Sequence, residues 1–246
     1  MMGRTHALTG ALGGLGVCHL TEATGTPVGA LQTVLVVAVT AGAAMWPDLD
    51  HPRSTVSRAL GPVTWLLART IARVSGGHRN GTHSLLGIGA VALITVAVNL
   101  AGPVALTVWA TFLIAVGSWS LMPRATGGVV AHTVICLVLG AVAVTTALVA
   151  LPPRGLMVTA TAVGAAIHIA GDMLTVEGCP LLWPAKPRLG VPLLTTEGVV
   201  ERLVIAPATG LAVIIGAWLQ LHAELAVELQ HLASGIADTL TAWSPR

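Results

Sequence analysis

Long apolar runs alternate with short polar segments along the whole chain. A helix of about 20 apolar residues can cross a hydrocarbon core that is about 30 Å thick, and within lipid its backbone groups are satisfied internally. The pattern predicts an all-α, polytopic membrane helical bundle with about seven spans. The predicted spans are residues 6–20, 28–46, 84–101, 104–122, 128–150, 155–176 and 199–221.

Two further stretches have helical spacing but too many polar residues to span a bilayer. Residues 60–74 place Arg69 and Arg73 four positions apart beside Trp65, which is typical of a helix lying in the membrane interface. The tail, about residues 222–246, mixes acidic and apolar residues in an amphipathic pattern. Ordinary packing of these two segments against the bundle is the alternative.

Composition supports the membrane class. Hydrophobic residues make up 54% of the chain and charged residues only 9%, whereas soluble domains are about 25% charged. Because no polar linker divides the chain, residues 1–246 are predicted to form a single integral membrane domain. The net charge of +2 and the dispersed basic residues argue against a nucleic-acid partner. The three cysteines lack a C-x-x-C pair and are predicted to be small core residues without a disulfide framework.

Several ionisable residues lie within or beside the apolar runs. Such groups are costly in lipid, so they usually face the protein interior and mark a functional site. If successive spans cross in alternate directions, all of these residues reach one membrane face. This convergence predicts a metal site formed by His6, Asp48, Asp50, His78, His83, His168 and Asp172.

Loop charge gives the expected orientation of this site. Most Lys and Arg residues fall on the same side as the candidate ligands, and cytoplasmic flanks are enriched in these residues. The chain is therefore predicted to lie in the inner (plasma) membrane with its site facing the cytoplasm.

Two short motifs supply carboxylates. In W-P-D-L-D-H, Pro47 ends a span and places Asp48 and Asp50 on a turn, where paired carboxylates can hold divalent cations. In H-I-A-G-D, His168 and Asp172 are separated by four positions, so they share a helical face with their Cβ atoms about 5–6 Å apart. The pair can share a metal, or the carboxylate can orient the imidazole. A purely structural His–Asp hydrogen bond is the alternative.

The loop H-R-N-G-T-H-S at residues 78–84 delivers two histidines to the start of the third span. Thr82 or Ser84 can cap that helix, and its free amide groups favour a phosphate oxygen. Arg79 can pair with the same anion through two hydrogen bonds.

These motifs together resemble the YdjM-like family of LexA-regulated, membrane-bound metal-dependent hydrolases. The resemblance is carried in matching order by H-A-L-T-G, P-D-L-D-H, H-R-N-G-T-H-S, H-I-A-G-D-M-L-T and G-C-P-L-L-W-P. It implies a polytopic hydrolase in which the seven residues named above bind the metal, with Glu201 as a possible addition. This chain departs from the family loop H-R-G-x-T-H-S, because Asn80 precedes Gly81 and the glycine is shifted by one position.

The ligand set also limits the chemistry. The set is larger than the four ligands of a typical zinc ion. Either some of these residues orient the ligands through hydrogen bonds, or two ions share the site. Two divalent ions about 3.5–4 Å apart suit phosphoester hydrolysis. Zinc is the metal most favoured and manganese is the next, with one or two ions bound.

The predicted activity is hydrolysis of a phosphoester in a membrane lipid or amphipathic substrate at the cytoplasmic leaflet. The expected catalytic residues are Asp50 or Glu201, which would assist the attacking water, and Arg79, which would stabilise phosphate charge. A divalent-cation transporter or a non-enzymatic metal-binding membrane protein is the alternative, since intramembrane histidines and carboxylates also line ion pathways.

Overall fold

A computed structural model of the protein describes residues 1–59, 61–122, 133–138, 140–141 and 154–222. Within these residues the regular structure is helical. The elements are α1 (Gly3–Ala23), α2 (Ala30–Ala43), the 3-10 turn η1 (Pro47–Asp50), α3 (Thr55–Arg58), α4 (Pro62–Val74), the 3-10 turn η2 (Gly81–His83), α5 (Leu85–Ala101), α6 (Pro103–Leu121), α8 (Arg154–Met173) and a final helix, Glu201–His222, which begins with the π-helical turn η4 (Glu201–Ile205).

The all-α membrane class is confirmed. In the described part of the chain, four helices are long and apolar enough to span a membrane, and they are Ala30–Asp50, Pro103–Leu121, Gly155–Met173 and Glu201–His222. α5 is apolar but shorter, and α1 covers the predicted first span with 21 residues. The count of seven stays a prediction, because most of the predicted span 128–150 and almost all of the tail lie outside the described residues.

The ends of the helices follow local sequence signals. Ser84 caps α5 by accepting a hydrogen bond from the amide of Gly87 at 3.4 Å. Gly102 separates α5 from α6 with a φ of 109°, which glycine adopts without strain. Pro103 then occupies the first turn of α6, where its missing amide hydrogen costs nothing.

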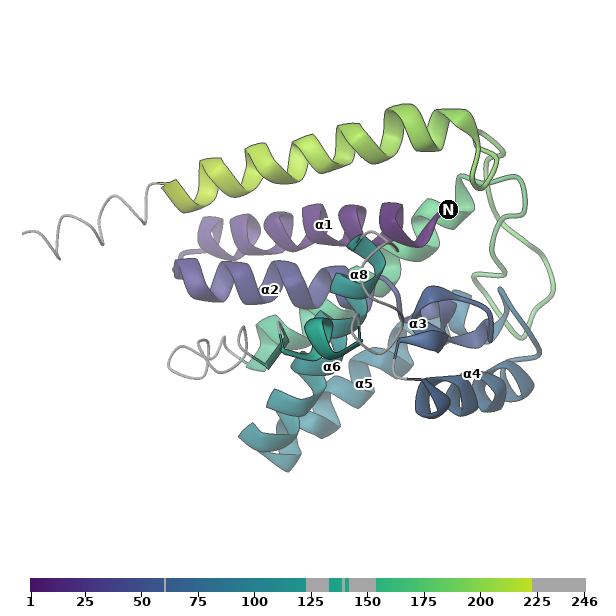
Figure 1. Cartoon of the computed structure of the whole chain (residues 1–246), viewed down its shortest axis with the longest axis horizontal. Helices are drawn as coiled ribbons and strands as arrows, with labels where there is room; N and C mark the ends of the chain where they lie inside the picture. Colours follow the sequence, from purple (N-terminus) through teal and green to yellow (C-terminus); the bar gives the residue numbers. More distant parts are fainter. Residues whose placement is uncertain (60, 123–132, 139, 142–153, 223–246) are drawn as a thin grey trace, which may run out of the picture.

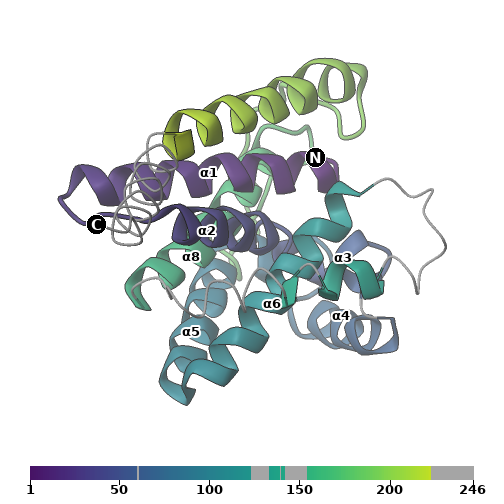
Figure 2. The same cartoon turned by 60° about the vertical axis from the view of Figure 1, so that its left-hand side comes forward.

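α2 lies at the centre of the bundle and packs against α1, α6 and α8 (Figures 1 and 2). Glycines make these close approaches possible. A Cβ atom on Gly42 of α2 would lie 1.9 Å from the carbonyl oxygen of Leu113 in α6. A Cβ atom on Gly164 of α8 would lie 2.5 Å from the carbonyl oxygen of Thr40 in α2. Small residues at such contacts are typical of helix packing in membranes.

Hydrogen bonds between buried side chains also join α5, α6 and α8. The Thr95 hydroxyl donates to the Thr161 hydroxyl at 3.1 Å and accepts from the Trp109 indole at 3.0 Å. Hydrogen bonds of this kind between membrane helices contribute about 0.6 kcal/mol each. They therefore fix the register of the helices more than they stabilise the bundle.

Within the amphipathic segment 60–74, the predicted helix is confirmed over Pro62–Val74 (α4), and its position at the membrane interface stays a prediction. α4 exposes Val63, Leu66 and Val74, and the Arg69 guanidinium lies 4.6 Å from the centre of the Trp65 ring. Figure 1 shows α4 at the same end of the molecule as the N-terminus and the loop that follows α8.

The three cysteines are buried and form no disulfide in the described structure, as predicted. Burial raises the pKa of the Cys179 thiol to about 12. This thiol therefore stays protonated, which suits a core residue rather than a nucleophile.

Candidate metal centre

The end of α2, the start of α5 and the end of α8 bring candidate ligands together. Asp48 and Asp50 lie on η1, directly after α2, because Pro47 starts a new turn there. His83 is the last residue of η2 and immediately precedes the cap of α5. His168 and Asp172 occupy the last turns of α8. The structure therefore brings these residues close together although they lie far apart in the sequence.

Four donor atoms from this group lie close together. The Nε2 atoms of His83 and His168 are 3.3 Å apart. Asp48 Oδ1 lies 3.7 Å from each of these nitrogens. Asp172 Oδ2 lies 3.6 Å from the first and 3.8 Å from the second. A tetrahedral zinc ion with bonds of about 2.0–2.2 Å has ligand atoms about 3.3–3.6 Å apart, so this donor set fits a four-coordinate ion.

The second nitrogen of each imidazole is held by a supporting group. His168 Nδ1 lies 2.6 Å from the carbonyl oxygen of Ala44, and a carbonyl only accepts, so Nδ1 carries the proton. His83 Nδ1 lies 3.2 Å from Asp50 Oδ2. In both residues this arrangement leaves the Nε2 lone pair for a metal, as is usual for histidine ligands.

Asp50 lies behind His83 rather than beside the four donor atoms. It is fully buried, and its Oδ1 lies 2.9 Å from His78 Nδ1. Its Oδ2 accepts from the Arg79 amide at 3.1 Å and from the Thr82 hydroxyl. Asp50 was predicted as a ligand and as a base, and this geometry suits an orienting role better.

The surroundings of His83 favour positive charge. Burial alone would lower the pKa of this imidazole, but the carboxylates of Asp48 and Asp50 raise it to about 9. The two carboxylates therefore place negative potential at His83, which a bound cation would also favour.

His6 forms the inner wall of the site. Its ring stacks on that of His168 with the centroids 3.6 Å apart, and its Nε2 lies 3.2 Å from Asp172 Oδ1. The buried Nδ1 atom of His6 has no hydrogen-bond partner in the described structure. His6, His168 and Asp172 have ligand atoms that all lie within 4.8 Å of one another. The structure thus brings His6 into the cluster, as predicted.

His78 lies at the solvent side. Its side chain is 35% exposed, and its ring is 4.5 Å from that of His51. Asp48, His78 and His83 form a second group with ligand atoms within 4.8 Å of one another. The two groups are adjacent, so the site has room for one ion or for a pair.

Asp172 also balances two buried cations. Its Oδ1 lies 2.6 Å from the Met1 ammonium group, and its Oδ2 lies 3.0 Å from Arg79 Nε. Arg79 continues outward, since its Nη1 donates to the Thr175 hydroxyl at 3.1 Å and lies 3.2 Å from a carboxylate oxygen of Glu177. The Arg79 guanidinium thus links the buried centre to the surface.

Glu201 is buried but is occupied elsewhere. Its Oε1 accepts from the Met2 amide at 2.5 Å, and its Oε2 accepts from the Glu197 amide at 2.9 Å. These bonds tie the start of the final helix to the start of α1. Both carboxylate oxygens are therefore used to hold the fold, and the predicted catalytic or ligand role stays untested.

Three polar groups at the site were not assigned to it from the sequence. Thr82 was predicted as a possible helix cap, but Ser84 forms the cap and the Thr82 hydroxyl binds Asp50. The Met1 amine has no motif of its own. Thr175 is the last residue of H-I-A-G-D-M-L-T, and its position three residues after Asp172 places both on one side of a helical turn.

Comparisons with known proteins agree on one family. The family model described as YdjM inner membrane protein matches residues 1–123 and 120–238. The chain is 29% identical over 152 residues to the inner membrane protein YdjM of Escherichia coli (strain K12), which covers 61% of this chain and 50% of that protein. The protein of the same name from Shigella flexneri matches with the same figures. The aligned part thus spans about half the length of these curated relatives, and no solved structure matches the chain.

Proposed function

The chain belongs to the YdjM inner membrane protein family, and we propose that it is a membrane-bound metal-dependent hydrolase. The observation that carries this proposal is the set of four donor atoms on Asp48, His83, His168 and Asp172, in which the two imidazole nitrogens lie 3.3 Å apart and each carboxylate oxygen lies 3.6–3.8 Å from both of them. The proposed substrate is a phosphoester of a membrane lipid or another amphipathic molecule at the cytoplasmic leaflet.

The donor types favour zinc, with manganese as the second candidate. Imidazole nitrogens and carboxylate oxygens in a four-coordinate arrangement suit zinc, whereas oxygen-rich octahedral sites suit manganese or magnesium. The four donors would hold one ion. The group formed by Asp48, His78 and His83 shares Asp48 and His83 with this set, so His78 is left at the edge of the site.

A bound divalent ion would supply an acidified water and would polarise a phosphoryl oxygen. The protein side chains would contribute proton transfer. His78 is the exposed member of a His–Asp pair, because Asp50 fixes its Nδ1 atom at 2.9 Å. We assign proton transfer at the substrate to His78 and orientation of its ring to Asp50, in place of direct action by Asp50 or Glu201.

Arg79 would bind the anionic part of the substrate. Its guanidinium is anchored by Asp172 and Thr175, and its remaining partner, Glu177, is 59% exposed. A phosphate can replace the exposed Glu177 carboxylate more easily than the buried Asp172. Planar guanidinium groups bind phosphate through two parallel hydrogen bonds, which supports this role for Arg79.

An activity screen over lipid phosphoesters, with the protein in lipid nanodiscs, tests the proposed function. Activity should disappear after chelation and should return with zinc or manganese. The variant His83→Ala should reduce it at least about 100-fold, because a ligand is lost. The variant His19→Ala changes an exposed histidine of α1 and should leave activity unchanged. Full activity in the chelated protein or in His83→Ala would contradict the hydrolase proposal, and metal flux in proteoliposomes without hydrolysis would favour the transporter.

Replacing Thr82 with valine tests the supporting layer of the site. The change keeps the side-chain shape but removes the hydroxyl that binds Asp50. Asp50 then holds His83 less firmly, and zinc affinity should fall about 10-fold, the lower end of the range for such supporting partners. The control is Thr70→Val, an exposed threonine on α4. Competition titration with a zinc chelator measures both, and equal affinities would argue against the supporting role of Asp50.

A further inference from the structure

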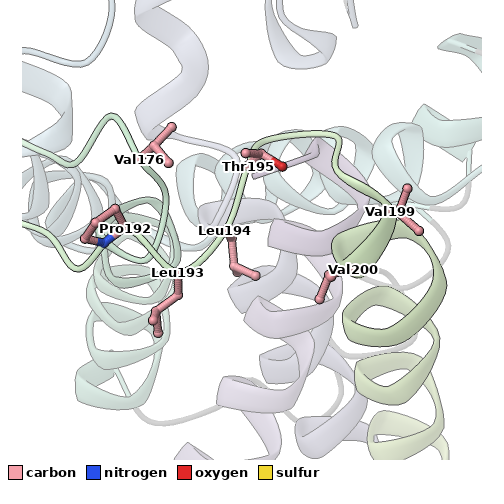
Figure 3. Close-up of a pocket in the computed structure, with 7 residues that line it drawn as sticks. All are labelled: Val176, Pro192, Leu193, Leu194, Thr195, Val199 and Val200. Carbon is pink, nitrogen blue, oxygen red and sulfur yellow. The ribbon is translucent and has the colours of Figure 1, made fainter.

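A largely apolar pocket with a volume of about 200 Å³ lies between the loop that follows α8 and the start of the final helix (Figure 3). One wall belongs to the loop that follows α8, and the other belongs to the start of the final helix. The apolar lining consists of Val176, Pro192, Leu193, Leu194, Val199 and Val200, and Thr195 adds a hydroxyl.

Each wall of the pocket is adjacent in sequence to a residue that makes a hydrogen bond near the candidate metal centre. Val176 follows Thr175, whose hydroxyl binds Arg79. Val200 precedes Glu201, which holds the start of α1 through the Met2 amide. The two walls are therefore held in place by the same residues that position the candidate site.

Backbone hydrogen bonds keep the loop wall in position. The Val176 amide donates to the Leu194 carbonyl at 3.1 Å, and the Leu194 amide donates to the Leu174 carbonyl at 3.0 Å. Leu174 directly follows the last residue of α8. The pocket is thus fixed to the helix that carries His168 and Asp172.

Apolar residues that line the pocket are also exposed at the protein surface. Leu193 is 68% exposed and Val199 is 72% exposed. The final helix continues from the pocket as a candidate membrane span, and few of its residues are buried within the protein. The pocket therefore opens onto exposed apolar side chains, which suits a hydrocarbon ligand.

We propose that this pocket binds the first methylene groups of a hydrocarbon chain whose phosphate end lies at Arg79 and the metal centre. This inference rests on the proposed function and specifies its substrate as an anionic, single- or multi-chain phosphate amphiphile. Pockets for whole drug-sized ligands measure about 300–1,000 Å³, so 200 Å³ holds only the part of the chain next to the phosphate. The exposed Lys186 and Arg188 on the same loop favour an anionic headgroup over a neutral one.

Short soluble alkyl phosphates test the pocket directly. The full chain in lipid nanodiscs is titrated by calorimetry with inorganic phosphate and with ethyl, butyl and hexyl phosphate, both with and without zinc. Affinity should rise by roughly fourfold for each methylene that enters the pocket, and it should level off once the pocket is full. Hexanol serves as the neutral control and should show no measurable binding.

Two variants fill the pocket and one matched variant does not. Leu193→Trp should remove the dependence on chain length while leaving the affinity for inorganic phosphate unchanged. Val199→Trp fills the pocket from the opposite wall and should have the same effect, which guards against a folding defect in either variant. Leu182→Trp changes a residue on the same loop that is 60% exposed and does not line the pocket. This variant should show the same dependence of affinity on chain length as the wild type.

The outcomes separate the two proposals. The pocket is overturned if affinity does not depend on chain length, if both filling variants leave that dependence unchanged, or if hexanol binds as tightly as hexyl phosphate. In each of these cases, binding of inorganic phosphate would still support the metal centre. In a second outcome, affinity rises with chain length and both filling variants abolish this rise, but zinc has no effect and inorganic phosphate does not bind. That result supports the pocket and overturns the metal centre. Absence of binding by every compound overturns both.

Discussion

Replacing Asp172 with asparagine should lower zinc affinity by at least about 100-fold, because loss of a mere supporting residue already costs about 10–100-fold. Asp172 Oδ2 is one of the four donor atoms, at 3.6 Å and 3.8 Å from the two imidazole nitrogens. An amide in its place keeps the shape of the side chain but removes the negative charge. Zinc content by mass spectrometry and competition titration measure the loss.

The same variant should also unfold at a lower temperature when no metal is present. Asp172 is the shared counter-charge of the Met1 ammonium group and the Arg79 guanidinium, and all three groups are buried. Removing one partner from a buried ion pair costs about 3–5 kcal/mol, since the remaining charge is left uncompensated. Thermal unfolding of the zinc-free protein in detergent or nanodiscs tests this expectation.

Glu177→Gln is the matched control for Asp172→Asn. Glu177 contacts the same guanidinium at 3.2 Å but is exposed to solvent. Exposed ion pairs contribute about 0–1 kcal/mol, so both stability and zinc affinity should change little. If Asp172→Asn binds zinc as tightly as this control, the four-atom centre is the wrong description of the site.

Replacing Gly164 with valine should destabilise the bundle by about 3 kcal/mol, at the upper end of the cost of overpacking. A Cβ atom at this position would lie 2.5 Å from the Thr40 carbonyl oxygen and 2.8 Å from the Ala43 Cβ atom. These contacts involve backbone and a short side chain, which cannot rotate away. α8 must therefore move away from α2.

That movement should also weaken the metal centre. His168 lies one helical turn beyond Gly164, and its Nδ1 atom binds the Ala44 carbonyl of α2 at 2.6 Å. Separation of the two helices lengthens this bond and releases the ring. Zinc content and thermal unfolding should fall together in Gly164→Val.

Gly155→Val is the control on the same helix. No atom lies within 4 Å of a Cβ atom at Gly155, so the added methyl groups meet open space. Valine also has a higher helix propensity than glycine, which leaves stability unchanged or slightly raised. Equal stability of the two variants would show that the close contact between α2 and α8 does not hold the site together.

Hydropathy and the alternation of spans predict that the candidate ligands meet, and in the described residues the structure brings them close together. The apolar runs correspond to α1, α2, α5, α6, α8 and the final helix in the described part of the chain. Because each predicted span reverses direction, His6, Asp48, His83 and Asp172 had to reach the same face. This argument depends only on segment length and order, which the sequence displays directly.

The roles of individual residues could not be predicted in the same way. Asp48 and Asp50 have the same chemistry and lie two positions apart, yet Asp48 faces the four-atom site and Asp50 lies behind His83. The 3-10 turn decides this difference, because about three residues per turn point these two side chains in different directions. Residue type alone does not encode that rotation.

Glu201 shows a second limit of sequence-based prediction. A buried acid at the start of a span was expected to take part in chemistry, but its oxygens accept from the amides of Met2 and Glu197. Every residue other than proline carries a backbone amide donor, so such partners have no signature in the sequence. Their position depends on how the loop before the final helix folds.

The wide spacing of the four donor atoms along the chain has a consequence for biosynthesis. His83 and His168, whose Nε2 atoms end 3.3 Å apart, are separated by 85 positions. At about 5–20 residues per second, the ribosome needs roughly 4–17 s to add the second histidine after the first. During that interval a nascent chain carries Asp48 and His83 without their partners, so the centre assembles only after most of the protein has been made and inserted.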